Sequence, residues 1–361
     1  MIRVLRSAPI SSPRQAGKSV ERERFGAREL AICLSHYDLG IIESIEDFVR
    51  GSRRSPKVIL QSQRGRFLFK RRASGRETIQ KVAFTHQIQL HLAAQNFPLP
   101  HLIGTRDANN SMLVWGEHIY ELFEFIAGGN YTGSLDATYN AGRILGLYHK
   151  LMEGFRSDYN PPTGSYHDAR AIHNAIRSSV SSLPPETRPP EDEMARTVES
   201  IEKHYHLSAR QANELGLRDW PAQIVHGDWH PGNMLFRHQH VAAVIDYDSA
   251  RLYQRVIDFA NGALQFSIIG GSEDPGNWPA YVDESRYKRF LMGYDSVNVI
   301  SQAEVRAAPF LMCEAMIAEA VLPIAATGSF GRMEGFPFLQ MIDRKVRWIL
   351  AHLEQMQSVL S

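Results

Sequence analysis

The sequence predicts an α+β fold with two lobes, a small N-terminal lobe (N-lobe) built on an antiparallel sheet and a larger, mainly helical C-terminal lobe (C-lobe). Three observations lead to this prediction. Short segments of alternating apolar and polar residues are concentrated before residue 127, long segments with helical periodicity begin at residue 135, and short apolar runs interrupt the helical part between residues 224 and 245. The 361 residues, 43% of them hydrophobic, suit one large domain or two lobes with a substantial core.

The N-lobe prediction rests on five strands and one helix. Alternation predicts three antiparallel strands, joined by turns at Gly51 and Gly65, and then two further strands: residues 41–50, 57–62, 66–70, 112–116 and 119–127. Between these groups, residues 77–95 have the apolar spacing of a helix, which ends before Pro98. Residues 1–28 are polar and broken by prolines, so we expect them to form an extension with little core of its own.

The chain is accordingly divided into an N-terminal extension with a leading helix (1–35), the N-lobe (36–125) and the C-lobe (126–361). In the C-lobe, residues 135–155 predict a strong amphipathic helix, on which His149 is expected to be packed rather than to bind a metal. Two or three helices and a proline-rich loop are expected before residue 222, and mostly helix from residue 251 onward.

Residues 224–236, IVHGDWHPGNMLF, carry the most informative pattern. His226, Asp228 and Asn233 fit H-x-D-x-x-x-x-N, in which the Asp takes the proton of an acceptor hydroxyl and the Asn ligates Mg²⁺. The apolar runs on both sides predict two short strands flanking a tight loop, with a turn at Pro231-Gly232. Such a loop would hold both polar side chains over one site.

A second segment, residues 241–248, extends this pattern. Its apolar run predicts a buried strand with Asp246 at its exposed end, where a carboxylate can bind the Mg²⁺ carried by nucleotide phosphates. An isolated motif of this kind arises by chance in many chains. The ordered combination of strand, HGDWHPGN loop, strand and IDYD segment is much more specific.

This order of segments resembles the aminoglycoside phosphotransferase and choline kinase superfamily from about residue 36 to the end, and within it the spore-coat kinase-like and type II homoserine kinase-like group. The resemblance implies a protein-kinase-like fold with ATP and Mg²⁺ as cofactors. It assigns Asp228 as the catalytic base and His226 as a brace of the catalytic loop. It also assigns Asn233 and Asp246 as metal ligands, and Asp258 as the residue that orders the segment after the metal-binding strand.

The nucleotide side of the site is expected to include a lysine of the sheet and the hinge between the lobes. Lys70 ends the third predicted strand, and we expect its ammonium to face the α- and β-phosphates, with Arg71 and Arg72 at the surface. The resemblance places the following residues beside adenine: Glu124, Phe125 and Ile126.

Two departures from the family pattern leave other classes of function open. The helix that usually supplies a Glu partner for the strand lysine has no acidic residue between Lys81 and His91, so His86 or Gln87 is only a neutral candidate. The first turn of the sheet lacks G-x-G-x-x-G. A kinase-like binding or structural protein is therefore an alternative. A protein serine/threonine kinase is less favoured because no D-F-G to A-P-E segment follows Asp246.

The expected reaction moves the γ-phosphoryl group of ATP to a hydroxyl of a small molecule. Candidates for binding this acceptor lie beside the base: Trp229, His230 and Asp248. Asp248, Glu314 and Glu319 are candidates for binding an amino group, although a hydrogen-bonded or surface carboxylate is the more ordinary role for each. The sequence does not choose among amino alcohols, amino acids, sugars and antibiotics.

Composition predicts a soluble cytoplasmic protein. The 40 Lys and Arg balance 39 Asp and Glu, which gives no reason to expect nucleic acid or an anionic membrane as a partner. No run approaches the ~20 consecutive apolar residues of a membrane span. Cys33 and Cys313 are far apart, so neither a disulfide framework nor a zinc site is expected. Two H-x-H pairs are expected to be solvated rather than to bind zinc: His204 with His206, and His238 with His240.

Overall fold

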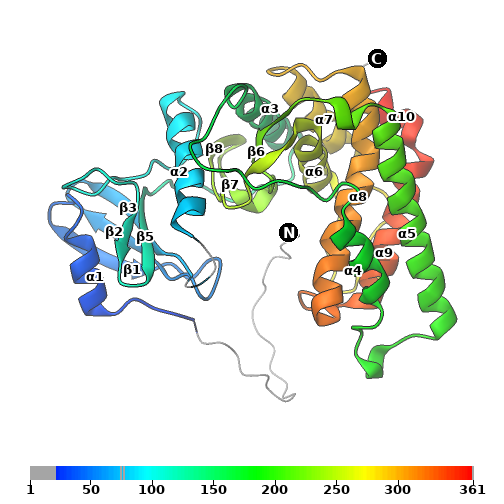
Figure 1. Ribbon diagram of the computed structural model, residues 1–361, viewed down its shortest axis with the longest axis horizontal. Helices are drawn as coiled ribbons and strands as arrows, with labels where there is room; N and C mark the ends of the chain where they lie inside the picture. Colours follow the sequence, from blue (N-terminus) through cyan, green and yellow to red (C-terminus); the bar gives the residue numbers. More distant parts are fainter. Residues whose placement is uncertain (1–21, 74, 76–77, 360–361) are drawn as a thin grey trace.

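Figure 1 shows the two lobes as the computed structural model places them, with residues 22–359 described except 74, 76 and 77. A five-stranded antiparallel sheet and one helix form the N-lobe, and a larger, mainly helical lobe lies beyond α2 (Ile79–Ala94). The predicted two-lobed α+β fold is confirmed. The extension expected for residues 1–28 falls mostly outside the described residues.

The sheet of the N-lobe has the strand order β1-β2-β3-β5-β4, and all neighbouring strands are antiparallel. Its strands are β1 (Ile42–Asp47), β2 (Lys57–Ser62), β3 (Gly65–Arg71), β4 (Leu113–Trp115) and β5 (His118–Glu124). Each overlaps a predicted strand, because the alternation of apolar and polar residues that marks a half-buried strand is strong in these segments.

The two faces of β3 point to different parts of the protein. Phe69 is buried in the N-lobe core, and Arg71 on the same face is paired with Glu29 of α1 (Ala27–Leu34). Lys70 lies on the opposite face, because successive side chains of a strand alternate. Directly opposite Lys70 on the neighbouring strand is Glu121 of β5.

The leading helix α1 is part of the N-lobe core. Cys33 and Leu34 are buried in the same apolar cluster as Phe69, and the ring of Phe25 stacks on Phe69 with 5.3 Å between centroids. The division that assigned this helix to an extension therefore places the start of the N-lobe too late.

Helix α2 packs with the C-lobe although it follows β3 in the chain. Its buried Phe84, Ile88 and Leu92 belong to the large apolar cluster of the C-lobe and not to the cluster beneath the sheet. Figure 1 shows α2 standing between the sheet and the remaining helices. Helix α2 contacts the sheet through polar groups, since His86 Nε2 lies 2.7 Å from Glu121 Oε1.

The C-lobe contains eight described helices and six short strands. The helices are α3 (Leu135–Leu151), α4 (Arg170–Ser179), α5 (Glu191–Glu214), α6 (Arg255–Ser267), α7 (Glu284–Asp295), α8 (Gln302–Thr327), α9 (Gly335–Ala351) and α10 (Leu353–Gln357). The strands are β6 (Ala222–Val225), β7 (Met234–Arg237), β8 (His240–Val244), β9 (Arg251–Gln254), β10 (Ser329–Phe330) and β11 (Met333–Glu334). The predicted succession of helices is thus confirmed.

Helix α8 is the central helix of the C-lobe and packs against α4, α5, α6 and α9. It is long and apolar enough to cross a membrane by length and composition, with a mean hydropathy of 1.6 over its most apolar window. Of that window, 67% is buried inside the protein. A helix that is apolar all round is expected at such a position in a core.

Candidate active site

Two small antiparallel ladders hold the loop that carries the motif. β6 ends at Val225 and pairs with β9, and β7 begins at Met234 and pairs with β8. Between them the chain turns at Gly227, where φ is +76° and a Cβ would collide with the carbonyl oxygen of Ser249, so only glycine fits. A 3-10 turn at Pro231–Asn233 returns the chain to β7. The two flanking strands predicted from the apolar runs are confirmed.

Asp258, in the first turn of α6, holds this loop from behind. Its carboxylate accepts hydrogen bonds from the amides of His226 and Gly227, both at 3.0 Å. It also contacts Nε2 of His149, at 3.2 Å, in a fully buried cluster. His149 is therefore packed, as expected. The prediction that Asp258 orders the segment after the metal-binding strand is wrong, because its oxygens are occupied by the backbone of the catalytic loop.

The carboxylate of Asp228 is fixed by two residues of its own loop. Asn233 Nδ2 donates to the carboxylate at 2.9 Å, and His230 Nε2 lies 3.4 Å from the same oxygen, while His230 Nδ1 accepts from the amide of Gly232. Burial alone would raise the pKa of Asp228, but the hydrogen bond from His230 outweighs it, and the pKa is lowered. Asp228 is therefore ionised at neutral pH.

Two predicted site residues lie behind the loop rather than on its open face. His226 is fully buried, its Nδ1 accepts from the amide of Asp228 at 3.3 Å, and burial lowers its pKa, so the ring is neutral. This is the arrangement expected of a brace. Trp229 is also fully buried, with its ring 5.3 Å from that of His226. The prediction that Trp229 contacts the acceptor is wrong, because its side chain fills the core under the loop. His230 is buried as well and contacts the base itself.

Asp246 and Asn233 offer oxygen atoms from two adjacent segments. Asp246 follows β8 with φ at +68°, a conformation that few non-glycine residues adopt, and its side chain is exposed. The amide of Ile245 donates to the carbonyl oxygen of Asn233 at 2.9 Å and ties the two segments together. Because Asn233 uses its amide nitrogen on Asp228, the amide oxygen is left for a cation. One carboxylate and one amide oxygen suit Mg²⁺.

Lys70 is held by a carboxylate of the neighbouring strand. Its Nζ lies 3.4 Å from Glu121 Oε2 and 3.9 Å from Asp248 Oδ2. Burial alone would lower the pKa of Lys70, but the charges of Glu121, Asp248 and Asp246 outweigh it, and the pKa is raised. A carboxylate of the sheet thus takes the place of a helix Glu beside this lysine. Gln87 is not the partner of this lysine, because its side chain bonds to Asp158 and Ser157 of the C-lobe.

The two cations that follow Lys70 are buried, so the prediction that they lie at the surface is wrong. Arg71 is 9% exposed and pairs with Glu29 on the face toward α1. Arg72 is 5% exposed and donates to Glu121 at 2.7 Å and to Asp248 at 2.9 Å. Glu121 was not predicted as a site residue because nothing in residues 120–124, YELFE, indicates that either of the two acidic residues is functional. Its place opposite Lys70 in the antiparallel register is the signal that would have found it.

The segment Glu124–Ile126, expected beside adenine, connects the sheet to the C-lobe. The amide of Glu124 donates to the carbonyl oxygen of His101, and the amide of Phe125 to that of Arg66, both at 2.9 Å. Within the described residues the amide of Ile126 has no protein acceptor, so this amide is the donor that remains for a ligand.

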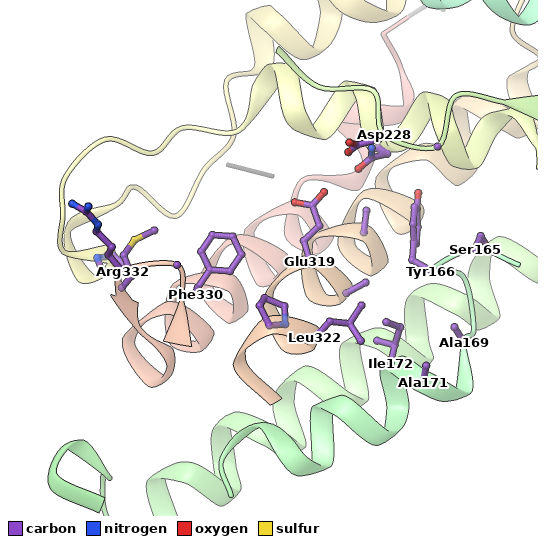
Figure 2. Close-up of a pocket in the computed structure, with 18 of the residues that line it drawn as sticks. Ser165, Tyr166, Ala169, Ala171, Ile172, Asp228, Glu319, Leu322, Phe330 and Arg332 are labelled. Carbon is purple, nitrogen blue, oxygen red and sulfur yellow. The ribbon is translucent and has the colours of Figure 1, made fainter. Parts of the chain in front are cut away.

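A cavity of roughly 1450 Å³ opens from Asp228 into the C-lobe (Figure 2). Gly227 and Asp228 line one end, and Phe330 and Arg332 line the other. Glu319 of α8 lies beneath Asp228, with its carboxylate directed toward the base. The cavity is larger than the ~300–1,000 Å³ typical of small-molecule sites. The carboxylates of Asp228 and of Glu319 therefore line the same cavity.

The other carboxylates considered for the acceptor have protein partners. Asp248 is paired with Arg72 and Lys70 and does not line the cavity, so its prediction as an acceptor residue is wrong. Glu314 is fully buried and accepts from the amide of Asp168, with His167 Nδ1 at 2.9 Å. Of the three, Glu319 is the one that lines the cavity.

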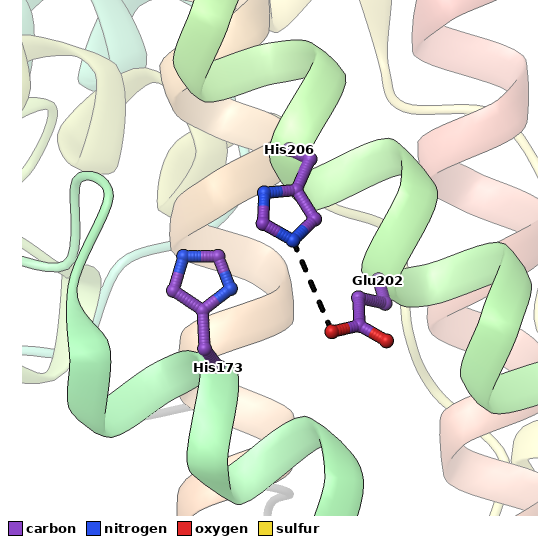
Figure 3. A group of neighbouring side chains, drawn as sticks. All are labelled: His173, Glu202 and His206. Carbon is purple, nitrogen blue, oxygen red and sulfur yellow. Dashed lines mark ion pairs between the residues drawn. The ribbon is translucent and has the colours of Figure 1, made fainter.

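The histidines considered for zinc are dispersed. His206 is exposed on α5, whereas His204 is largely buried beside Asp343. Figure 3 shows that His206 and Glu202 of α5 lie near His173 of α4, with possible ligand atoms within 4.8 Å of one another. Glu202 Oε1 already accepts two hydrogen bonds from Arg177, at 2.9 and 2.7 Å. The cluster is thus accounted for as an ion pair beside two histidine rings.

Comparisons with solved structures show the fold. An aminoglycoside phosphotransferase from Alicyclobacillus acidocaldarius has 17% identity and a TM-score of 0.68, with 91% of this chain and 96% of that chain covered. A microcompartment-associated aminopropanol kinase has 14% identity and a TM-score of 0.64, over 90% and 97%. Choline kinase from Cryptosporidium parvum has 15% identity and a TM-score of 0.57, over 92% and 96%. No curated protein matches the chain.

The sequence itself matches the family model described as "Phosphotransferase enzyme family" over residues 48–290, which is more than half of the chain. The matched range contains the lysine strand, the catalytic loop and the segment of Asp246. The resemblance to the superfamily is therefore confirmed, while the narrower spore-coat and homoserine kinase-like group stays a prediction. The chain belongs to the phosphotransferase enzyme family.

Proposed function

We propose that the protein transfers the γ-phosphoryl group of ATP, with Mg²⁺, to a hydroxyl group of a small molecule. One observation carries the proposal. Asp228 is ionised, is fixed by Asn233 and His230, and lines a large cavity, while Lys70 and Asp246 lie on the nucleotide side of the same loop. Base, acceptor space and phosphate-side groups thus meet at one point.

Each residue has a role that follows from its contacts. Asp228 accepts the hydrogen bond of the acceptor hydroxyl and orients it for in-line attack. His230 and Asn233 keep the carboxylate in one rotamer, which limits the orientations that the acceptor can adopt. Lys70 neutralises phosphate charge, and the free amide of Ile126 is the donor for the base of the nucleotide.

The metal would be held by the Asp246 carboxylate and the Asn233 amide oxygen, and it would supply charge neutralisation at the transferring phosphoryl group. Asp246 suits this role because it is exposed and within the described residues its carboxylate has no hydrogen-bond partner. Its positive φ is a strained conformation, and strain of this kind is concentrated at functional sites.

The acceptor that fits the cavity is large and carries a cationic group. Five carboxylates line the cavity against two guanidinium groups: Asp228, Glu273, Asp274, Glu319 and Glu334 against Arg251 and Arg332. Apolar surface from α4, α8 and the β10–β11 turn completes the wall. Among the described residues Glu319 accepts a hydrogen bond from Gln265 at 2.6 Å, and a cation of the acceptor would neutralise its charge.

The alternative of a non-catalytic binding protein rested on the missing helix Glu. Glu121 supplies a carboxylate to Lys70 from the sheet, so the lysine is positioned without that residue. The absence of a G-x-G-x-x-G pattern in the first turn of the sheet is the remaining argument for that alternative, and a phosphoryl-transfer assay decides between the two.

Phosphoryl transfer should be measured with Mg-ATP against a panel of amino alcohols, amino sugars and hydroxylated peptide antibiotics. For the best acceptor, Asp228→Asn is expected to lower kcat by ~10²–10⁴-fold and to leave ATP affinity nearly unchanged, because Asp228 acts on the acceptor only. Asp192→Asn, on the exposed face of α5, is the matched control. Equal turnover of wild type and Asp228→Asn would contradict the assignment.

A further inference from the structure

Two cations at the end of β3, Lys70 in the strand and Arg72 directly after it, both contact Glu121 and Asp248. Lys70 and the residue two positions later, Arg72, lie on one face of the strand, and Arg71 lies on the other. The side chain of Arg72 is 5% exposed, and that of Lys70 is 20% exposed. Burying a charge is costly unless it is paired, so the partners of Arg72 determine what its guanidinium can do.

Glu121 holds both cations at once. Its Oε1 accepts from Arg72 at 2.7 Å, and its Oε2 lies 3.4 Å from Lys70 Nζ. Burial alone would raise the pKa of Glu121, but the charges of Lys70 and Arg72 outweigh it and hold the pKa well below its usual range. The carboxylate is fully buried, so it is available only to these partners and to His86.

His86 of α2 fixes the orientation of Glu121. Its Nε2 donates to Glu121 Oε1 at 2.7 Å, and its Nδ1 lies 2.8 Å from Ser111 Oγ. In this protein α2 therefore acts on the phosphate lysine indirectly, through a carboxylate that belongs to the sheet. This connection replaces a direct helix carboxylate.

Asp248 balances the remaining charge from the C-lobe. It accepts from Arg72 at 2.9 Å and lies 3.9 Å from Lys70, two residues after Asp246. Counting only described residues, Lys70 and Arg72 contribute two positive charges and Glu121 and Asp248 two negative ones. An anionic polyphosphate entering between Lys70 and Asp246 would compete with Asp248 for the guanidinium, which can form two parallel hydrogen bonds to a phosphate.

We propose that Arg72 is a second phosphate-binding cation of the site, and that Glu121, oriented by His86, positions Lys70 and Arg72 as a pair. The proposal rests on the function proposed above. It differs from a purely structural role for Arg72, in which the guanidinium would only neutralise Glu121 and Asp248 and would never contact the nucleotide.

The test compares Arg72→Gln with Arg71→Gln, which removes the same charge from a similarly buried position on the opposite face of β3. Affinities for ATP, ADP, AMP and adenosine, each with Mg²⁺, are measured by calorimetry. Arg72→Gln is expected to lower the affinities for ATP and ADP about 10- to 100-fold and to leave the affinity for adenosine within about twofold of the wild-type value. Arg71→Gln is expected to leave all four affinities within about twofold of the wild-type values.

A double variant separates phosphate binding from charge neutralisation. In Arg72→Gln/Asp248→Asn the half-buried carboxylate that would lose Arg72 as its partner is also neutralised. If Arg72 binds phosphate, the double variant still binds ATP weakly; if ATP affinity returns to the wild-type value, the proposal is overturned. Equal losses for ATP and adenosine in Arg72→Gln would overturn it too, since they indicate a disturbed fold. Failure of the wild-type protein to bind ATP would instead refute the proposed function.

Discussion

At the scale of single residues, the histidines around the catalytic loop are kept neutral by burial. Burial lowers the pKa of His149 and of His226, although nearby carboxylates oppose the shift. A neutral His149 has one donor and one acceptor nitrogen. Its Nε2 faces the Asp258 carboxylate, and its Nδ1 lies 2.8 Å from the Tyr294 hydroxyl, so the structure assigns the proton to Nε2.

The lowered pKa values of His149 and His226 make the stability of the protein depend on pH. Because the pKa of each histidine is lower in the folded than in the unfolded protein, the unfolded state binds more protons below pH ~6.5. The free energy of unfolding should therefore be fully retained above pH ~6.5 and fall as the pH drops below it. Urea unfolding of wild type and His149→Gln at pH 8 and pH 5.5 tests this. The variant should have a lower free energy of unfolding than wild type at pH 8, but this free energy should fall less between pH 8 and pH 5.5. An equal fall in the two proteins would show that His149 does not contribute to the pH dependence of stability.

Residues joined by local spacing could be predicted, and residues joined across the sheet could not. Asp228, Asn233 and Asp246 were found because one loop and one strand end carry them. Glu121 and Arg72 meet only after β3 and β5 pair, so their partnership depends on strand register and is not visible in either segment. Trp229 was misplaced because a sequence motif does not say which side of its loop faces the core.

At the scale of secondary structure elements, α3 and α7 approach each other closely at glycines. A Cβ on Gly142 would fall on the carbonyl oxygen of Phe290, and a Cβ on Gly293 on that of Tyr139. Farther along α3, a Cβ on Gly146 would lie 2.7 Å from the carbonyl oxygen of Tyr294. The close approach brings α7, with Tyr294, against His149. Helical periodicity predicted α3, but the apolar pattern alone does not reveal a backbone contact.

We therefore expect Gly142→Ala to destabilise the protein, although alanine favours a helix over glycine by ~1 kcal/mol. The obstacle is backbone, which cannot rotate away as a side chain can, so the helices must separate at a cost of at least ~2 kcal/mol. Chemical denaturation of Gly142→Ala and of Gly26→Ala gives the comparison. Gly26 has negative φ and no heavy atom within 4 Å of an added Cβ. A stable Gly142→Ala protein would show that α3 and α7 can move apart freely.

At the scale of the whole molecule, the protein has two apolar cores that do not coincide with the order of the chain. The sheet and α1 share one core, and α2 packs into the other with the C-lobe helices. Between these two units lie the polar contacts of Glu121 with His86 and of Arg72 with Asp248. The chain order predicted the lobes, but not that the apolar face of α2 is turned toward the larger one.

This division predicts two levels of local stability. The sheet unit has the smaller core and is joined to the rest largely by polar contacts, so its amides should exchange with solvent at a lower opening free energy than those of α6 and α8. Mg-ATP bound between the two units should raise the protection of β3 and β5 by about 2.7 kcal/mol at 100 times its Kd, with little change in the C-lobe core. Native-state hydrogen exchange measures both the opening free energies and the protection by Mg-ATP.

Asp248→Asn, which removes the charge that Arg72 contacts, should lower the protection of the sheet alone, by about 1–3 kcal/mol. If sheet and C-lobe instead open with one free energy, in the presence and in the absence of Mg-ATP, the two units behave as a single cooperative core, and the polar contacts between them are as strong as apolar packing.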